Sequence, residues 1–244
     1  MSISAEVRAF LSLTKFGIVI FVLFGGLVGY CIGLNHHMPF SVSHLIQFMV
    51  GLYFLSSGMF ALNQIQEIHL DKLMVRTASR PLPIGHLSLV SAWVLSVCFM
   101  LSSMIILYFS RPILALLAVA TVVLYNGFYT ISWKPKWAFA AVPGAIPGAL
   151  PVVFGYLAVQ ESLWTSECLY LFMIMFLWQM PHFWIIAMRF HEDYGKAGIP
   201  VLPNRVGLRR TTYHIGLYLF VYVAFAVASP WFVDTRYFYL LFVV

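Results

Sequence analysis

Long apolar stretches, separated by short polar segments, follow one another along the chain. A helix needs about 20 apolar residues to cross the hydrocarbon core of a bilayer, and seven stretches of about that size are present. They cover residues 16–34, 44–68, 86–109, 112–133, 138–158, 163–188 and 213–232. An eighth begins at Arg236, and the chain stops at Val244. The pattern predicts an all-α polytopic membrane helix bundle that forms a single domain over residues 1–244, and we expect the natural protein to continue further.

The composition and the placement of charge support a membrane protein. Hydrophobic residues make up 62% of the chain and charged residues only 9%, against about 25% charged residues in soluble domains. If the N-terminus is inside, 12 of the 14 lysines and arginines lie on that same side, which is the positive-inside pattern. The N-terminus and the loops after the second and sixth stretches are therefore expected in the cytoplasm. With no signal-peptide cleavage site and no transit-peptide composition, a bacterial inner membrane is expected.

Two other function classes are not supported by the sequence. The formal net charge of +6 does not indicate nucleic-acid binding, because the basic residues follow the loops and form no continuous stripe. Cys31, Cys98 and Cys168 are far apart and form no CxxC pair, so neither a metal knuckle nor covalent haem attachment is indicated.

Small residues and prolines predict how some stretches pack. Gly25, Gly29 and Gly33 recur every four residues, which allows another helix to approach closely. The run "PGAIPGALP", residues 143–151, is expected to interrupt the fifth stretch. Irregular backbone at membrane depth is tolerated only inside protein or beside a cavity, so this run either packs or lines a pocket.

Polar residues gather at the end of the second stretch, in "NQIQEIHLDKLMVRTASRPL", residues 63–82. Asn63, Glu67 and Asp71 are four residues apart, so a continuous helix would place their oxygens on one face. Carboxylate and amide oxygens are the ligands that Mg²⁺ prefers, together with phosphate oxygens. Ionisable residues at membrane depth are functional candidates by default. These three residues are therefore predicted to bind Mg²⁺.

Three basic residues come directly after these acids in the sequence, namely Lys72, Arg76 and Arg80. Cationic side chains of this kind suit the recognition of phosphate oxygens. Acids that hold a metal beside bases that hold phosphate form the pattern of a metal-diphosphate site. The alternative is that these three residues are only positive-inside loop charges.

The second polar region is "WQMPHFWIIAMRFHEDYGKAGIPVLPNRVG", residues 178–207. His182, Arg189 and Asp193 fall close to one helical stripe if Pro181 only kinks the helix. Asp193 could then complete a metal site begun by the second stretch. Taken alone, His182 is better interpreted as an ordinary interior histidine. Its neighbours Trp178, Gln179, Arg189 and Asp193 favour a functional group instead.

These motifs resemble the UbiA superfamily of intramembrane prenyltransferases, and within it the branch that farnesylates haem. The resemblance runs from "LTKFG", residues 13–17, to the end of the chain, and includes "YTISWK", residues 129–134, "WQMPHF", residues 178–183, and "EDYGKAGIPVLP", residues 192–203. It departs from the family pattern outside the two charged motifs at Phe16, Pro135 and Ala140. Within the first motif, Glu67 stands where many relatives have Asp, and this change keeps the carboxylate.

The resemblance implies nine helices around a central cavity, Mg²⁺ as cofactor, and farnesyl diphosphate and haem B as substrates. It also implies haem A synthase or terminal-oxidase assembly factors as candidate partners. The candidate catalytic residues are Asn63, Glu67, Asp71, Arg76 and Asp193, and the candidate Mg²⁺ ligands among them are Asn63, Glu67, Asp71 and Asp193. The candidate substrate-binding residues are Lys72, Arg80, Lys134, His182, Arg189, Tyr129, Trp178 and Gln179.

Two alternatives remain at this point. A related prenyltransferase that acts on an aromatic or quinone precursor would use the same metal site with a different acceptor pocket. A transporter or haem-binding protein without transferase chemistry would use the charged residues to line a permeation path or to hold haem. Acids clustered on one side of the membrane argue against a through-path with acids near the midplane.

Overall fold

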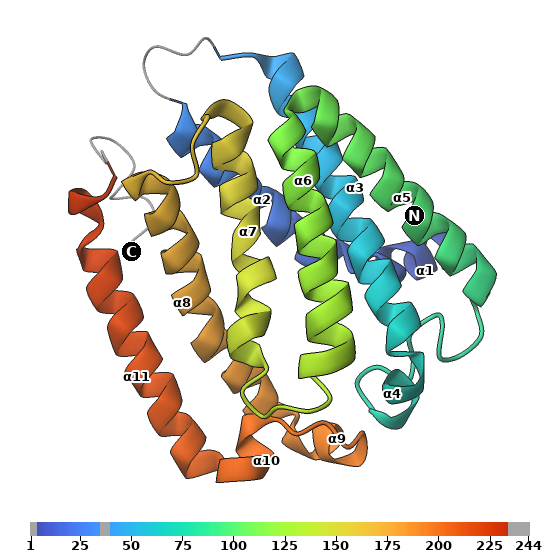
Figure 1. Ribbon diagram of the computed structural model, residues 1–244. Helices are drawn as coiled ribbons and strands as arrows, with labels where there is room; N and C mark the ends of the chain where they lie inside the picture. Colours follow the sequence, from blue (N-terminus) through green and yellow to red (C-terminus); the bar gives the residue numbers. More distant parts are fainter. Residues whose placement is uncertain (1–3, 35–39, 234–244) are drawn as a thin grey trace.

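The computed structural model describes residues 4–34 and 40–233, and every regular element in these two ranges is helical. Six helical runs are long and apolar enough to cross a membrane (Figure 1). They are α2 (Phe16–Gly33), α3 (Val42–Gln66), α5 (Leu89–Ser110), α6 with η1 (Pro112–Val122 and Val123–Trp133), α7 (Ala141–Val159) and α8 (Ser166–Arg189). The described chain therefore has the predicted membrane helix bundle.

The remaining helices are shorter or more polar. The seventh predicted stretch corresponds to α11 (Leu208–Val227). This helix has two arginines in its first turn and is not among the six runs that are long and apolar enough to cross a membrane. The start of the predicted eighth stretch lies outside the described residues. The short elements are α1 (Ala5–Leu13), α4 (Ile68–Leu73), α9 (His191–Lys196), α10 (Leu202–Val206) and η2 (Ser229–Trp231).

Capping residues explain why some helices start later than the hydropathy predicts. The hydroxyls of Ser88 and Thr165 accept hydrogen bonds from the first turns of α5 and α8. Such caps satisfy backbone N–H groups that have no partner within the helix. The predicted starts at residues 86 and 163 were therefore three residues early.

Helix α7 is the most buried of the six and packs closely against α2. A methyl group on Gly29 would overlap the backbone carbonyl of Val152, and one on Gly155 would overlap the carbonyl of Gly26. The predicted close approach at the glycines of α2 is confirmed, although Gly25 has ordinary room for a methyl group. The prediction that residues 143–151 interrupt the fifth span was wrong, because α7 continues through Pro147 and Pro151.

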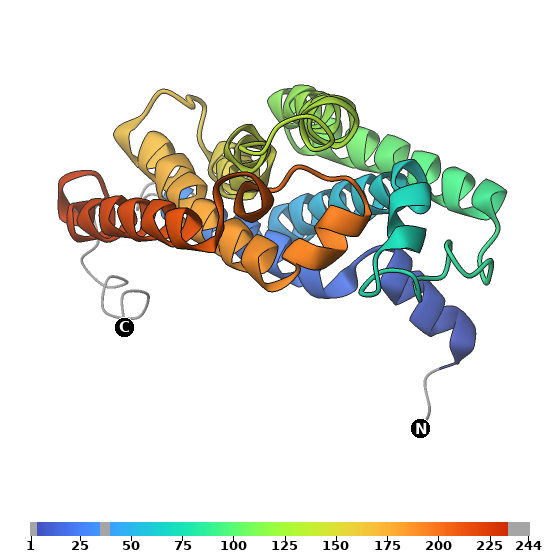
Figure 2. The same cartoon turned by 90° about the horizontal axis from the view of Figure 1, so that it is seen from below.

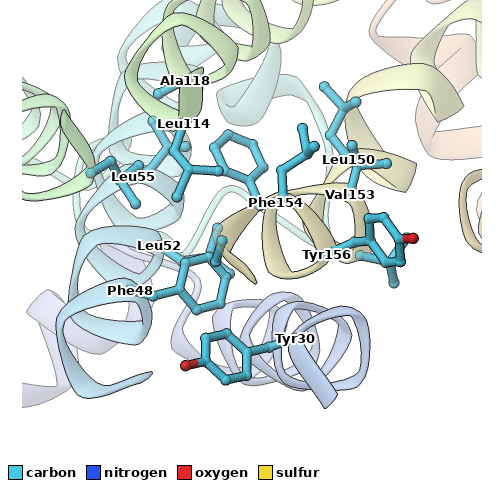
Figure 3. Close-up of a cluster of buried hydrophobic side chains, with 14 of the residues drawn as sticks. Tyr30, Phe48, Leu52, Leu55, Leu114, Ala118, Leu150, Val153, Phe154 and Tyr156 are labelled. Atoms are coloured by element: carbon cyan, nitrogen blue, oxygen red, sulfur yellow. The ribbon is translucent and has the colours of Figure 1, made fainter. Parts of the chain in front are cut away.

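The apolar core lies where α2, α3, α6 and α7 meet (Figure 3). Phe48 and Leu52 of α3 pack with Phe154 of α7, and Tyr30 of α2 stacks on Phe48. Large apolar side chains also cover much of the outer surface, including α5 and α11 at opposite edges of the molecule (Figure 2). An apolar outside is expected for helices that face lipid.

The two charged loops meet at one end of the bundle, where α4, α9 and α10 lie (Figure 1). Buried Met74 packs there against Ala197 and Ile199. The backbone N–H of Arg76 donates to Asp193 Oδ2 at 3.2 Å. The loops after the second and sixth spans therefore lie together at one end of the bundle, and the side of the membrane that this end faces stays a prediction.

Candidate active site

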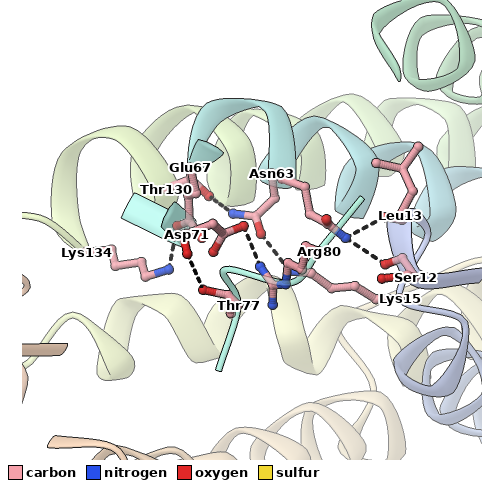
Figure 4. A network of polar contacts seen from close by, with 11 residues as sticks. Ser12, Leu13, Lys15, Asn63, Glu67, Asp71, Thr77, Arg80, Thr130 and Lys134 are labelled. Carbon is pink, nitrogen blue, oxygen red and sulfur yellow. Dashed lines mark hydrogen bonds and ion pairs between the residues drawn. The ribbon is translucent and has the colours of Figure 1, made fainter. Parts of the chain in front are cut away.

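The polar end of α3 does not form one continuous helix. Glu67 has backbone angles of φ −99° and ψ 7°, so α3 ends before it and α4 begins after it. The backbone N–H groups of Glu67 and Asp71 still bond to the carbonyls of Asn63 and Glu67 at 3.0 Å and 2.8 Å, so the four-residue spacing continues across this break. All three residues are buried, with 2%, 4% and 0% of their surface exposed. They lie within one polar network (Figure 4).

Each of these three residues is bonded to a basic side chain from a different part of the chain. The bases come from the start of α2, from the segment after η1 and from the loop after α4. The pairs are Lys15 Nζ with Asn63 Oδ1 at 2.7 Å, Lys134 Nζ with Glu67 Oε1 at 2.5 Å, and Arg80 Nη1 with Asp71 Oδ2 at 2.7 Å. Three bases face two acids, so the network suits an additional anion.

Burial and charge act in opposite directions on these groups, which lie outside the six apolar runs. Burial disfavours ionised Glu67, yet the charges of Lys134 and Lys15 outweigh burial and hold the pKa of Glu67 below its usual value. Burial likewise opposes the charge of Lys134, but Glu67 outweighs it and raises the pKa of Lys134. Lys15 is bonded to a neutral amide, and burial followed by the like charge of Arg80 lowers its pKa to about 7.

The donor set fits a magnesium ion. Asp71 Oδ1 is a buried carboxylate oxygen without a hydrogen-bond partner, so it has a free lone pair for a cation. Carboxylate and amide oxygens of this kind are suitable Mg²⁺ ligands. In the described ranges no three His, Cys, Asp or Glu side chains are grouped closely enough to hold a metal ion. The four-residue Mg²⁺ site that includes Asp193 therefore stays a prediction.

Lys15 and Thr130 belong to this network but were not among the sequence candidates. Lys15 precedes α2 in a left-handed conformation with φ 52°, and its ammonium group lies 5.4 Å from the centre of the Phe60 ring. Thr130 accepts a hydrogen bond from Asn63 Nδ2 at 3.1 Å. The sequence offered one signal for each, since Lys15 adjoins an apolar stretch and Thr130 lies between Tyr129 and Lys134.

The remaining charged candidates lie at the surface of the same end. Helix α8 ends at Arg189, so the predicted stripe does not continue unbroken to Asp193, which belongs to α9. The guanidinium groups of Arg76 and Arg189 lie 5.0 Å and 5.3 Å from the ring centre of Phe190. Lys72 is exposed.

Three candidates of the second motif lie on different faces of α8. Trp178 stacks on His182 with ring centres 4.8 Å apart, and both side chains are exposed. Gln179 is buried against Gly148 of α7, and its Nε2 donates to the backbone carbonyl of Ala145 at 3.4 Å. The stack and the amide therefore do not form one cluster.

Tyr129, the aromatic candidate of η1, belongs to the walls of the bundle. Its ring stacks on Tyr125 with centres 5.8 Å apart. It also fills the space beside Gly144 of α7, where any larger residue would collide with the ring.

The model of the UbiA prenyltransferase family matches residues 18–244 of the chain. The chain belongs to the UbiA prenyltransferase family. It is 47% identical over 234 residues to a protein of Bdellovibrio bacteriovorus named protoheme IX farnesyltransferase, covering 96% of this chain and 80% of that protein. A Flavobacterium johnsoniae protein of the same name is 35% identical, with 89% of this chain and 72% of that protein covered.

Solved structures confirm the fold. A UbiA homolog from Archaeoglobus fulgidus bound to DMAPP and Mg²⁺ has a TM-score of 0.71 at 17% identity, over 90% of this chain and 76% of that chain. A digeranylgeranylglyceryl phosphate synthase structure has a TM-score of 0.72 at 19% identity, over 91% and 77%. By family this chain is a prenyltransferase with several apolar helices that can cross a membrane, and its fold is that of the UbiA structures.

Proposed function

We propose that this chain is a protohaem IX farnesyltransferase, which joins the farnesyl group of farnesyl diphosphate to a vinyl group of haem B and so makes haem O. The buried network of three bases and two acids is the observation that carries the proposal. The 47% identity to a relative of that name, over nearly the whole chain, supports the acceptor.

In the proposed site, Asn63, Glu67, Asp71 and Asp193 hold Mg²⁺ through their side-chain oxygens. The bound ion supplies positive charge to the diphosphate leaving group. When Mg²⁺ and the diphosphate bind, the present hydrogen-bond partners would be exchanged. An oxygen that now accepts from a base would bind the cation, and that base would donate to a phosphate oxygen instead. This exchange is easiest at Asp71, because its Oδ1 has no hydrogen-bond partner to give up.

The bases then neutralise the diphosphate as the bond between its oxygen and the farnesyl carbon breaks. Arg80, Lys134 and Lys15 act from the buried network, and Lys72 and Arg76 act from the loop. Preorganised cations in a site of low dielectric stabilise developing negative charge far better than water does. Each is therefore expected to act mainly on the transition state for leaving-group departure.

The allylic cation left behind needs walls that exclude water until the acceptor attacks. The apolar side chains of the bundle provide such walls. The terminal vinyl carbon of haem forms the new carbon–carbon bond, and the carbon next to the ring takes oxygen from water with loss of a proton. Atoms balance to a hydroxyethylfarnesyl side chain and free diphosphate.

The acceptor is proposed to approach α8. The stacked pair of Trp178 and His182 offers a flat aromatic surface and an imidazole for a haem edge, iron or propionate. Arg189 lies at the end of the same helix, and its guanidinium suits a propionate. Tyr129 and Gln179 form part of the wall between η1, α7 and α8. The enzyme is placed in the bacterial inner membrane, with haem A synthase or oxidase assembly factors as candidate recipients.

Mass spectrometry of extracted haem tests the function directly. Membranes that contain the protein are incubated with haem B, farnesyl diphosphate and Mg²⁺, with and without EDTA. A more hydrophobic haem of the expected mass, absent with EDTA, is the expected result. Unchanged haem together with a prenylated quinone precursor would mean that the acceptor is a quinone precursor, while the proposed diphosphate site would stand. Unchanged haem and no prenyl product from folded protein would refute the transferase.

A further inference from the structure

Thr130 is placed between two partners that together fix the direction of its hydroxyl. The hydroxyl donates to the backbone carbonyl of Tyr125 at 2.9 Å, and its oxygen accepts from Asn63 Nδ2 at 3.1 Å. Thr130 and Asn63 are both buried, with 6% and 2% of their surface exposed. Water therefore does not substitute for either contact.

These contacts determine which way the Asn63 amide faces. A threonine hydroxyl has one hydrogen, and here it is committed to Tyr125. Only a donor can complete the contact with Asn63, so the NH₂ group faces Thr130. The opposite side meets Lys15 Nζ at 2.7 Å, a donor that requires the amide oxygen. A flipped amide would place oxygen against oxygen and NH₂ against an ammonium.

The backbone of η1 holds Thr130 in this position. The bond from the hydroxyl reaches the carbonyl five residues earlier, in keeping with the π-helical geometry of residues 123–133. One turn before Thr130, Asn126 Nδ2 donates to the carbonyl of Met59 at 3.1 Å and to Gln66 Oε1 at 3.2 Å. Gln66 Nε2 in turn donates to the backbone carbonyl of Asn126 at 3.0 Å. The η1 face is thus fastened to α3 beside the site.

We propose that Thr130 is a positioning residue that turns the oxygen of the Asn63 amide, and not its nitrogen, toward the metal-diphosphate site. The inference rests on the proposed function, since it assigns Asn63 to Mg²⁺. Thr130 acts only through Asn63 and touches neither substrate. Partners that orient a metal ligand typically change metal affinity by about 10- to 100-fold when they are removed.

The test is Mg²⁺-dependent binding of a non-hydrolysable farnesyl thiodiphosphate, measured by calorimetry on detergent-solubilised protein. In Thr130→Val, which keeps the shape but loses the hydroxyl, the Mg²⁺ concentration for half-maximal binding should rise about 10-fold. Binding and turnover at saturating Mg²⁺ should return close to wild type. Thr130→Ser restores a hydroxyl and should restore the wild-type Mg²⁺ dependence.

Thr121→Val is the matched control. Thr121 is also buried and lies on the same helical run, but its hydroxyl donates only to the carbonyl of Leu117 in its own helix. Its Mg²⁺ dependence should stay unchanged. In an Asn63→Asp background both side-chain oxygens are acceptors, so there is no amide to orient, and Thr130→Val should add less than about a twofold effect.

Wild-type Mg²⁺ dependence in folded Thr130→Val overturns the inference, as does an undiminished effect in the Asn63→Asp background. If the valine variant does not fold, Thr130→Ala carries the same test, with Thr121→Ala as its control. If wild-type protein binds the analogue without any Mg²⁺ dependence, the proposed metal site itself is refuted. This result distinguishes failure of the proposed function from failure of the role of Thr130.

Discussion

At the scale of single residues, the proposed Mg²⁺ ligands Asn63, Glu67 and Asp71 are each buried beside a basic side chain. Removing one member of a buried ion pair leaves an uncompensated charge and typically costs about 3–5 kcal/mol. In the substrate-free protein, each of the two ion pairs therefore compensates the buried charge of its partner. Substrate binding is expected to exchange these partners.

Asp71→Asn tests the acid that has a free oxygen. The amide keeps the shape but loses the negative charge that would hold Mg²⁺, so turnover should fall by about 100-fold or more. Farnesylated haem is measured by mass spectrometry, and size-exclusion chromatography checks that the variant still folds. Glu192→Gln, at an exposed acid of α9, should keep activity. Normal turnover in Asp71→Asn would remove Asp71 from the site.

Lys15 predicts a pH dependence of stability in the substrate-free protein. Its pKa is about 7 in the folded chain, against 10.5 as the ordinary value expected after unfolding. Between these values the unfolded chain binds more protons, so the contribution of Lys15 to the free energy of unfolding rises with pH from 7 to 10.5. The midpoint of thermal unfolding of wild type minus that of Lys15→Met should therefore increase over this range.

Exposed Lys136 supplies the control for this measurement. The difference between wild type and Lys136→Met should stay constant over the same pH range. A difference for Lys15→Met that is constant, or that falls as the pH rises, contradicts the assignment.

At the scale of elements, two irregularities place the site. The break at Glu67 separates α3 from α4, so that Asp71 faces Arg80. The π-helical second half of the fourth span places Thr130 beside Asn63 and leads to Lys134 beside Glu67. Between α2 and α7, by contrast, the elements are regular, and small residues let their backbones approach closely.

Gly29→Ala tests that close approach. The added methyl group would meet the carbonyl of Val152, a backbone atom that cannot turn aside, so the helices must separate. Overpacking of this kind typically costs about 1–3 kcal/mol, which should lower the midpoint of thermal unfolding by several degrees. Gly17→Ala, in the same helix with nothing within 4 Å, should be neutral or stabilising. Equal midpoints for the two variants would contradict this packing.

At the scale of the whole molecule, the two charged loops lie together at one end of the bundle. Both loops carry lysines and arginines, so the positive-inside rule predicts that this end faces the cytoplasm. The predicted orientation rests on the charges of the loops and on no single residue.

Cysteine labelling tests the orientation. In a variant without Cys31, Cys98 and Cys168, single cysteines replace exposed Glu192 at the charged end and exposed Ser43 at the start of α3. An impermeant maleimide should label Ser43→Cys in intact spheroplasts and Glu192→Cys only in inverted vesicles. The reverse pattern would place the charged loops outside.

The amino-acid sequence by itself determined the helical class, seven stretches, the shared end of the two charged loops and the residue types of the site. Each of these depends on local quantities, namely the run of apolar residues that a bilayer requires and the charges between the runs. One difference between the predicted and the observed helix bounds was also local. Cap residues set the starts of two helices that hydropathy alone had placed too early.

Only the tertiary structure decided which base meets which acid, and that Lys15 and Thr130 belong to the site at all. Lys15 and Asn63 are 48 positions apart, and Thr130 and Asn63 are 67 apart. Contacts over such separations depend on how helices pack and where they break, and hydropathy does not encode either. Both irregularities lie where buried side chains bond to other parts of the chain, as Glu67 does to Lys134 and Asn126 to the carbonyl of Met59, and buried polar groups require such partners.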